Sequence, residues 1–166
     1  MRWKLEPVPD AYPSGLMYNC TAMAAVPVVI DASAVIAVIT NEAYKPALIR
    51  LTEGADLLSP SSLPIEVGNA FSAMFKRGRI SLKQAKAAVG VYQSIAIRLT
   101  SVDLARALEL SHQLEIYAYD AYLIACSLQH RAALLTLTDN RFIRRKNSQV
   151  SGIGEFFGFF VGKRSE

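Results

Sequence analysis

The sequence has 166 residues, of which 52% are hydrophobic, and a formal net charge of +4 at pH 7. A chain of this length fits one domain with a continuous core, and no stretch reaches the roughly 18 uncharged apolar residues that a membrane-spanning helix requires. The mild positive charge is compatible with a polyanionic partner but does not identify one.

The cysteines and the N-terminal composition indicate the compartment. Cys20 and Cys126 stand in unlike contexts, which argues against a disulfide framework. The first 25 residues mix charges with prolines and lack the apolar segment of a signal peptide. We therefore expect a cytoplasmic protein in which residues 1–25 form an extension, with Met23 as an alternative first residue, and residues 26–162 form the domain.

The first half of the domain alternates strand and helix patterns. A β-branched run from Val26 ends at Asp31 and predicts a central parallel strand. Helix patterns follow at 33–39 and 45–52, a strand at 55–59, and a helix that starts near Pro64 and that Gly78 is expected to end.

The second half continues the alternation. Ser81 and Gln84 form a capping-box pattern for a helix through about Gln93. A strand is expected at 95–100, helices at 103–114 and 119–129, and a strand at 133–138. This order predicts an α/β sandwich around a mainly parallel sheet.

Four acidic residues stand at informative positions. Asp31 and Asp139 each directly follow a predicted strand, and Glu66 lies in the first turn of the helix after strand 55–59. The carboxyl ends of parallel strands share one edge of the sheet, so these three side chains are expected together. Asp120 opens a helix that follows another helix, and the edge rule alone does not place it.

Such a cluster points to metal chemistry. Neighbouring carboxylates repel one another and are tolerated mainly when a divalent cation neutralises them. Oxygen ligands without an accompanying His and Cys set favour Mg²⁺ or Mn²⁺, and one or two such ions support phosphodiester hydrolysis. The alternative is structural: Asp31 only ends a strand, Asp120 only caps a helix and Asp139 only begins a turn.

Four short segments together resemble a known family. They are Val-Val-Ile-Asp-Ala-Ser-Ala at 28–34, Pro-Ile-Glu-Val-Gly-Asn-Ala at 64–70, Tyr-Asp-Ala-Tyr-Leu-Ile-Ala at 119–125, and Leu-Leu-Thr-Leu-Thr-Asp-Asn-Arg-Phe at 134–142. In this order and spacing they resemble the PIN-domain nucleases, especially the toxin subunits of VapBC toxin–antitoxin pairs. The resemblance implies a three-layer α/β/α sandwich and a metal-dependent endoribonuclease acting on structured RNA such as tRNA or rRNA. It also implies an inhibitory antitoxin partner and a homodimer.

The resemblance assigns roles to individual residues. Ser33 matches a hydroxyl residue two positions after the first Asp, and Asn69 shares the helix face of Glu66. The family usually has Thr or Ser two residues before its last Asp, where Leu137 stands between Thr136 and Thr138; a strand bulge would let Thr138 support the site. The catalytic, metal-binding acids would be Asp31, Glu66, Asp120 and Asp139.

Basic side chains follow two of these acids along the chain. They are expected to contact RNA phosphates, although favourable interaction with a helix C-terminus and ordinary solubility also account for the first group. The residues are Lys76, Arg77 and Arg79 in the first group and Arg141, Arg144 and Arg145 in the second.

Other side chains receive packing interpretations. Cys126 and His130 share a helix face, but without a second ligand pair we expect packing rather than zinc. Tyr117, Tyr119 and Tyr122 are expected in the core and site wall rather than as a base-stacking platform. For the phenylalanine-rich tail at 156–160, packing within the chain and contact with a partner stay open.

Two other functions stay open beside the toxin. One is a noncatalytic PIN-like binding or assembly module. The absence of one of the four acids from the sequence would have favoured this hypothesis. The other is a PIN nuclease in RNA maturation, which differs chiefly in its partner.

Overall fold

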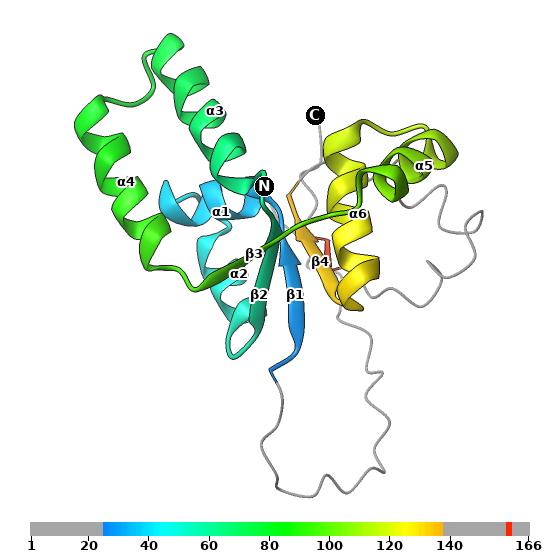
Figure 1. The fold of residues 1–166 in the computed structure, drawn as a ribbon. Helices are drawn as coiled ribbons and strands as arrows, with labels where there is room; N and C mark the ends of the chain where they lie inside the picture. Colours follow the sequence, from blue (N-terminus) through cyan, green and yellow to red (C-terminus); the bar gives the residue numbers. More distant parts are fainter. Residues whose placement is uncertain (1–24, 138–158, 161–166) are drawn as a thin grey trace, which may run out of the picture.

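A computed structural model describes residues 25–137 and 159–160 (Figure 1). The described strands form one sheet in the order β3-β2-β1-β4-β5, and every neighbouring pair is parallel. The strands are β1 (Pro27–Ile30), β2 (Asp56–Pro60), β3 (Ile97–Thr100), β4 (Ala133–Thr136) and β5 (Phe159–Phe160). The helices are α1 (Ala32–Ile39), α2 (Lys45–Thr52), α3 (Leu63–Lys76), α4 (Leu82–Ser94), α5 (Leu104–Leu114) and α6 (Ala118–His130).

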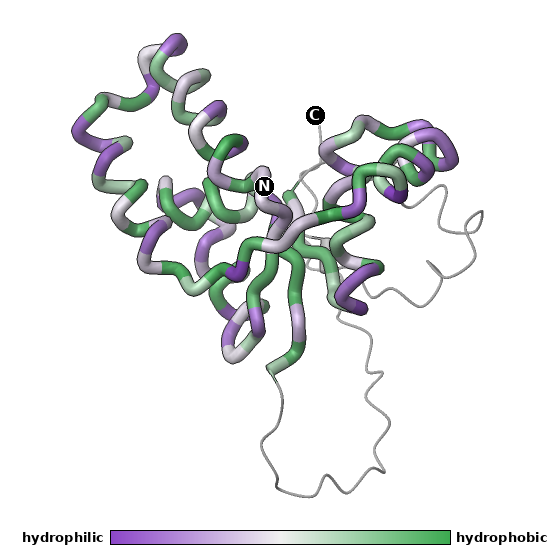
Figure 2. The backbone as a smooth tube through the Cα atoms, viewed as in Figure 1, coloured by the Kyte–Doolittle hydropathy of each residue, from purple (hydrophilic) through white to green (hydrophobic). Residues whose placement is uncertain are grey.

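The helices cover the sheet on both faces (Figure 1). Val28 and Ile30 of β1 join the core shared with α1 to α4, whereas Val29 between them joins the core shared with α5 and α6. Side chains of successive strand residues point to opposite faces, so a strand that is apolar on both faces can contribute to two cores. Strands β1 and β4 are accordingly drawn mainly in green (Figure 2). The predicted three-layer α/β/α sandwich is confirmed.

Most predicted elements occur within two residues of their expected bounds. Helix 45–52 is α2, and the capping box of α4 is complete, with the backbone N–H of Ser81 donating to Oε1 of Gln84 at 2.9 Å. Helix α3 ends at Lys76, and Gly78 follows with a φ of +62°, a backbone conformation that glycine adopts without a steric penalty.

Two predicted strands are shorter than expected. Strand β3 starts at Ile97 because Ile95 still caps the end of α4. Strand β4 ends at Thr136 because the next backbone N–H, that of Leu137, donates to the side chain of Ser33. Thr138, the last residue of the predicted strand, lies outside the described residues.

The C-terminal tail contributes the edge strand β5. Leu135 is paired with Phe159 and Thr136 with Phe160, which supports packing of this part of the tail within the chain.

Residues 1–24 lie outside the described part, so the expected extension is not tested there. None of the helices in the described part is long and apolar enough to cross a membrane.

Candidate active site

Asp31 lies at the carboxyl end of the central strand β1. Its backbone N–H donates to the carbonyl oxygen of Leu135 at 3.0 Å, and only 6% of the residue is exposed. Asp31 occupies the N-cap position of α1, but its side chain makes no capping hydrogen bond. Helix capping therefore does not explain this buried carboxylate.

Two hydroxyl groups orient the Asp31 carboxylate. Ser33 Oγ and Thr136 Oγ1 both donate to Oδ2 of Asp31, the second at 2.7 Å. Ser33 Oγ in turn accepts the backbone N–H of Leu137 at 3.0 Å. Hydrogen bonds to an ionised oxygen are stronger than neutral ones, so this network fixes Asp31 and joins the ends of β1 and β4.

Glu66 lies in the first turn of α3, as predicted, and is half-buried. Ser62 Oγ donates to its Oε1 at 2.8 Å. Burial raises the pKa of Glu66 most; the Ser62 hydrogen bond acts in the opposite direction, and the negative charges of Asp31 and Asp120 raise the pKa further. Glu66 therefore shares one electrostatic environment with two other acids.

Asp120 completes this group from the opposite layer. It lies in the first turn of α6, whose N-cap is Tyr117, so Asp120 is not the helix cap that the structural alternative required. Burial and then the charge of Asp31 raise its pKa. We call Asp31, Glu66 and Asp120 the acid cluster; Asp139 lies outside the described residues.

The acid cluster fits a hard divalent cation by its donor chemistry. Neither Glu66 nor Asp120 is in a salt bridge with any described residue, and both carboxyl groups are harder to ionise than usual. A cation bound here would relieve that repulsion. Within residues 25–137 and 159–160, however, no group of three His, Cys, Asp or Glu side chains is close enough to hold an ion. Direct ligation by one or two of these carboxylates plus water is the arrangement that Mg²⁺ usually adopts.

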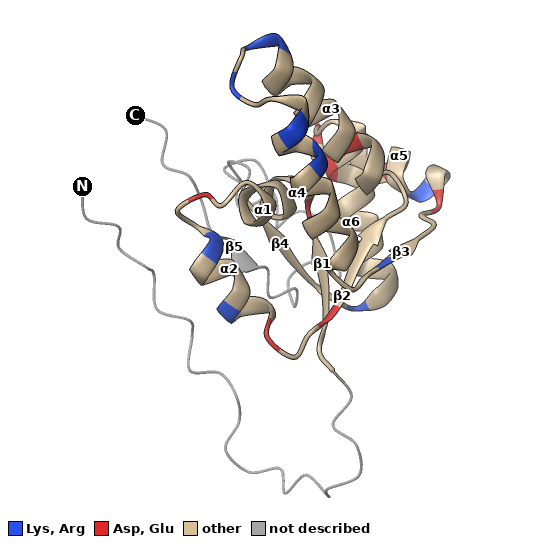
Figure 3. Ribbon diagram, turned by 90° about the vertical axis from the view of Figure 1, so that its left-hand side faces the viewer, with Lys and Arg blue, Asp and Glu red and all other residues tan. Residues whose placement is uncertain are grey.

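The basic residues of α3 lie away from the acid cluster. Lys76, Arg77 and Arg79 are exposed at the C-terminal end of the helix, where blue segments gather near the α3–α4 connection (Figure 3). Asn69 is exposed one turn after Glu66. The second basic group, Arg141, Arg144 and Arg145, lies outside the described part of the chain.

The predicted core position is confirmed for one of the three tyrosines and wrong for the other two. Tyr122 packs against the α5–α6 core, but Tyr117 and Tyr119 are 86% and 55% exposed. They lie at the start of α6, where Tyr117 is the N-cap and Tyr119 is in the first turn. Cys126 is fully buried and His130 bonds Thr100 Oγ1 at 3.1 Å, which confirms packing for that pair.

Two site residues escaped sequence reasoning. Thr136 bonds Asp31, and its place in the strand-like run before Asp139 was the available signal; the predicted Thr138 lies outside the described residues. Ser62 lies four residues before Glu66, one helical turn away, a spacing at which side chains meet.

Comparison with known proteins agrees with this geometry. A parallel sheet with helices on both faces defines an α/β protein, and in such folds ligands bind at the carboxyl edge of the sheet, where Asp31 lies. The PIN domain family model matches residues 28–147, and the chain belongs to that family, whose members are generally nucleases. The chain has no significant match among curated protein sequences.

Two solved structures share the fold. A crystal structure of PAE2754 from Pyrobaculum aerophilum is 20% identical, with a TM-score of 0.58 over 73% of this chain and 79% of that one. A chain of a toxin–antitoxin complex from Klebsiella pneumoniae is 12% identical, with a TM-score of 0.50 over 75% of this chain and 93% of that one.

Proposed function

We propose that this protein is a Mg²⁺- or Mn²⁺-dependent endoribonuclease and the toxin component of a toxin–antitoxin pair. Asp31, Glu66, Asp120 and Asp139 would be its metal-binding and catalytic acids. The observation that carries the proposal is the buried Asp31 carboxylate, held by two hydroxyl groups at the end of β1 in a PIN domain, with the charge of Asp31 acting on both Glu66 and Asp120. The Klebsiella pneumoniae neighbour supports the toxin role.

Each residue of the acid cluster would have its own role. Asp31, held by two hydroxyl groups, gives a carboxylate of fixed orientation at the base of the site. Glu66 and Asp120 lie in helices on opposite faces of the sheet and would contribute further carboxylates to the cation site, directly or through water. A cation bound there would neutralise the cluster and stabilise the negative charge that develops on the reacting phosphodiester.

The substrate assignment rests on charge. The segment 67–102 contains six Lys and Arg residues and no Asp or Glu. Five of these cations are exposed on α3, on α4 or on the connection between them, namely Lys76, Arg77, Arg79, Lys83 and Lys86. Lys76, Arg77 and Arg79 would bind phosphates of the RNA strand away from the reacting bond. Arg141, Arg144 and Arg145 would do the same next to Asp139, and Asn69 would assist Glu66.

The cellular setting is also part of the proposal. The nuclease domain would span residues 26–162, act in the cytoplasm as a homodimer, and be inhibited by a cognate antitoxin. The RNA would be a tRNA or rRNA, as in similar toxins.

Incubation of the purified, antitoxin-free chain with total RNA and Mg²⁺ or Mn²⁺ tests the activity. We expect discrete fragments that disappear with EDTA and with Asp31→Asn. Asp103→Asn is the matched control, because Asp103 caps α5 through the backbone N–H of Ala105 at 2.9 Å and Asn caps equally well. Full activity of Asp31→Asn would refute the mechanism.

A further inference from the structure

Helix α3 begins at a serine that does not cap it. Ser62 occupies the N-cap position, but its side chain makes no capping hydrogen bond. A serine at this position usually accepts the backbone N–H of the second or third helical residue. Here the second residue is Pro64, which has no N–H, and the N–H of the third, Ile65, donates to the Ser62 carbonyl oxygen at 2.9 Å. The Ser62 hydroxyl is therefore available to another partner.

That partner is the carboxylate of Glu66, one turn further along α3. Ser62 Oγ donates to Oε1 of Glu66 at 2.8 Å, and no donor from the described part of the chain bonds Oε2. A hydroxyl that donates to an ionised carboxylate makes a charge-assisted hydrogen bond, which is stronger than a neutral one. The bond therefore holds one oxygen of Glu66 and leaves the other for a cation or for water bound to the cation.

The connection that carries Ser62 is bonded to the strands on both sides of β2. Ser59, a fully buried residue of β2, donates its hydroxyl hydrogen to the carbonyl oxygen of Ile30 at 2.9 Å, and Ile30 directly precedes Asp31. The first backbone N–H after β2 donates to the carbonyl oxygen of Thr100, at the end of β3, at 3.0 Å. The Ser62 backbone is thus held in a fixed position relative to β1 and to Asp31.

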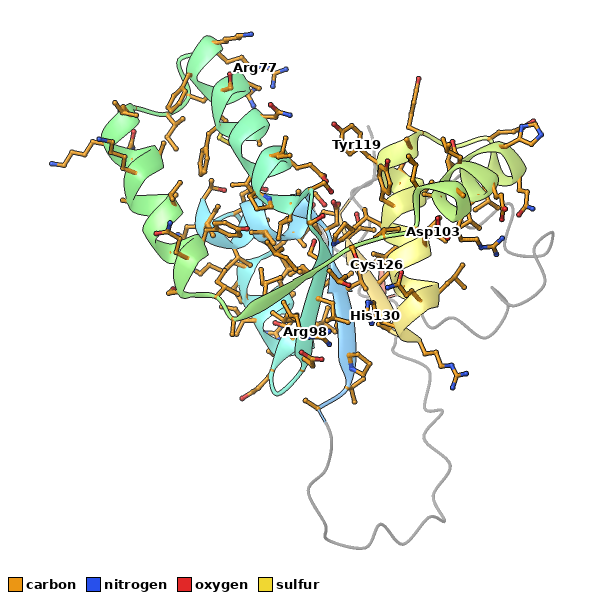
Figure 4. The ribbon with its side chains drawn as sticks, viewed as in Figure 1. Arg77, Arg98, Asp103, Tyr119, Cys126 and His130 are labelled. Carbon is orange, nitrogen blue, oxygen red and sulfur yellow. The ribbon has the colours of Figure 1, made fainter. Side chains whose placement is uncertain are left out.

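Ser62 and Glu66 lie at the end of α3 that meets the sheet. Figure 4 shows Arg77 at the opposite end of the helix, away from the strands. The first turn of α3 follows directly from the carboxyl end of β2, so it is the part of the helix that can contribute to a site at the carboxyl edge.

We propose that Ser62 is a positioning residue of the cation site, whose hydroxyl holds the Glu66 carboxylate in the orientation that receives the cation. This proposal rests on the proposed metal-dependent function and deepens it by adding a residue that acts through Glu66. A glutamate side chain has several rotatable bonds, and fixing them before the cation arrives reduces the entropy lost on binding. Loss of such a hydrogen-bond partner commonly weakens metal binding by about 10- to 100-fold.

Mn²⁺ binding to the full chain, measured by calorimetry without RNA, tests this role. We expect Ser62→Ala to raise the Kd for Mn²⁺ about tenfold, and Ser62→Thr, which keeps the hydroxyl, to stay within about threefold of the wild type. In a Glu66→Ala background, Ser62→Ala should raise the Kd no further, because the hydroxyl acts only through the Glu66 carboxylate.

Ser81→Ala is the matched control. Ser81 is the N-cap of α4, and its hydroxyl oxygen does cap that helix by accepting the backbone N–H of Gln84 at 3.3 Å. Its replacement should lower the Tm and leave the Kd for Mn²⁺ unchanged.

The possible results separate the positioning role from the nuclease function. An unchanged Kd in Ser62→Ala, or an equal increase with and without Glu66→Ala, would overturn the positioning role even if the wild-type chain cleaves RNA. Mn²⁺ binding that depends on Ser62 in a chain that cleaves no RNA would contradict only the nuclease proposal. A wild-type chain that binds no Mn²⁺ would overturn both.

Discussion

Thr136, the last residue of β4, donates its hydroxyl hydrogen to Oδ2 of Asp31, the residue that follows β1, over 2.7 Å. The two residues are 105 positions apart in sequence, and parallel pairing of β1 with β4 brings them together. The bond orients the carboxylate that we place at the centre of the metal site.

Thr136→Val tests this orienting bond. Valine keeps the shape of the side chain but removes the donor to a buried carboxylate. We expect kcat/KM for RNA to fall about 10- to 100-fold and the free energy of unfolding to fall by about 1 to 2 kcal/mol. Cleavage kinetics and urea denaturation measure the two effects.

Thr100→Val is the matched control for that experiment. Thr100 ends β3 and bonds His130 rather than an acid. We expect this variant to lose some stability and to keep its kcat/KM. Equal loss of activity in both variants would show that Thr136 has no special link to Asp31.

The sequence predicted where Asp31 and Glu66 lie in the fold through one topological rule. Asp31 and Glu66 come after strands of a parallel sheet, and residues in that position gather at the carboxyl edge. The rule did not place Asp120, which comes after a helix. The missing information was tertiary: α6 joins β4 through only two residues, Arg131 and Ala132, so its other end lies about 20 Å back at the same carboxyl edge.

Thr136 and Tyr117 show which parts of the site depend on tertiary structure. Thr138, next to Leu137, was expected to support the site. The structure shows that β4 ends at Thr136, where the Leu137 N–H turns to Ser33, and that Thr136 bonds Asp31. Tyr117 is 86% exposed, and the apolar pattern of the helix that follows it did not indicate this.

The pKa values of Glu66 and Asp120 set a pH dependence of stability. Both are raised, so the folded chain binds protons more tightly than the unfolded chain at these groups. Without divalent cations, the free energy of unfolding should therefore fall as pH rises from the ordinary carboxyl range through the raised pKa values, and stay lower at neutral pH.

The double variant Glu66→Gln/Asp120→Asn should remove this dependence. In EDTA at neutral pH we expect a higher Tm than in the wild type, with the two proteins converging in acid. Glu109→Gln, which removes an exposed carboxylate in a salt bridge, should not raise the Tm. A lower Tm for the double variant at neutral pH would mean that the acid cluster stabilises the metal-free fold.

The salt dependence of RNA binding tests the basic residues of α3. Replacing Lys76, Arg77 or Arg79 with Ala should reduce the slope of log K against log salt by about 0.7 for each RNA phosphate that the variant no longer neutralises. Arg50→Ala, at an exposed cation in the last turn of α2, is the control and should leave the slope unchanged. If all variants had the same slope as the wild type, these residues would contribute to solubility and to interaction with the helix C-terminus but not to phosphate binding.

Cys126 should be chemically inert in the folded protein. Burial raises the pKa of its thiol to about 11, with Arg98 acting weakly in the opposite direction. In a Cys20→Ser background we expect a thiol reagent at pH 8 to react at least roughly 100-fold more slowly than with free cysteine until the chain is unfolded. Rapid labelling of the native protein would contradict the packing of α6.

Mn²⁺ binding measured by calorimetry tests the central claim most directly. We expect the wild-type chain to bind Mn²⁺, and Asp31→Asn and Asp120→Asn each to weaken binding at least about tenfold in parallel with the loss of RNA cleavage. Asp103→Asn should match the wild type in both assays. Mn²⁺ affinity that is unchanged in Asp31→Asn and Asp120→Asn would contradict the assignment of the acid cluster as the metal site.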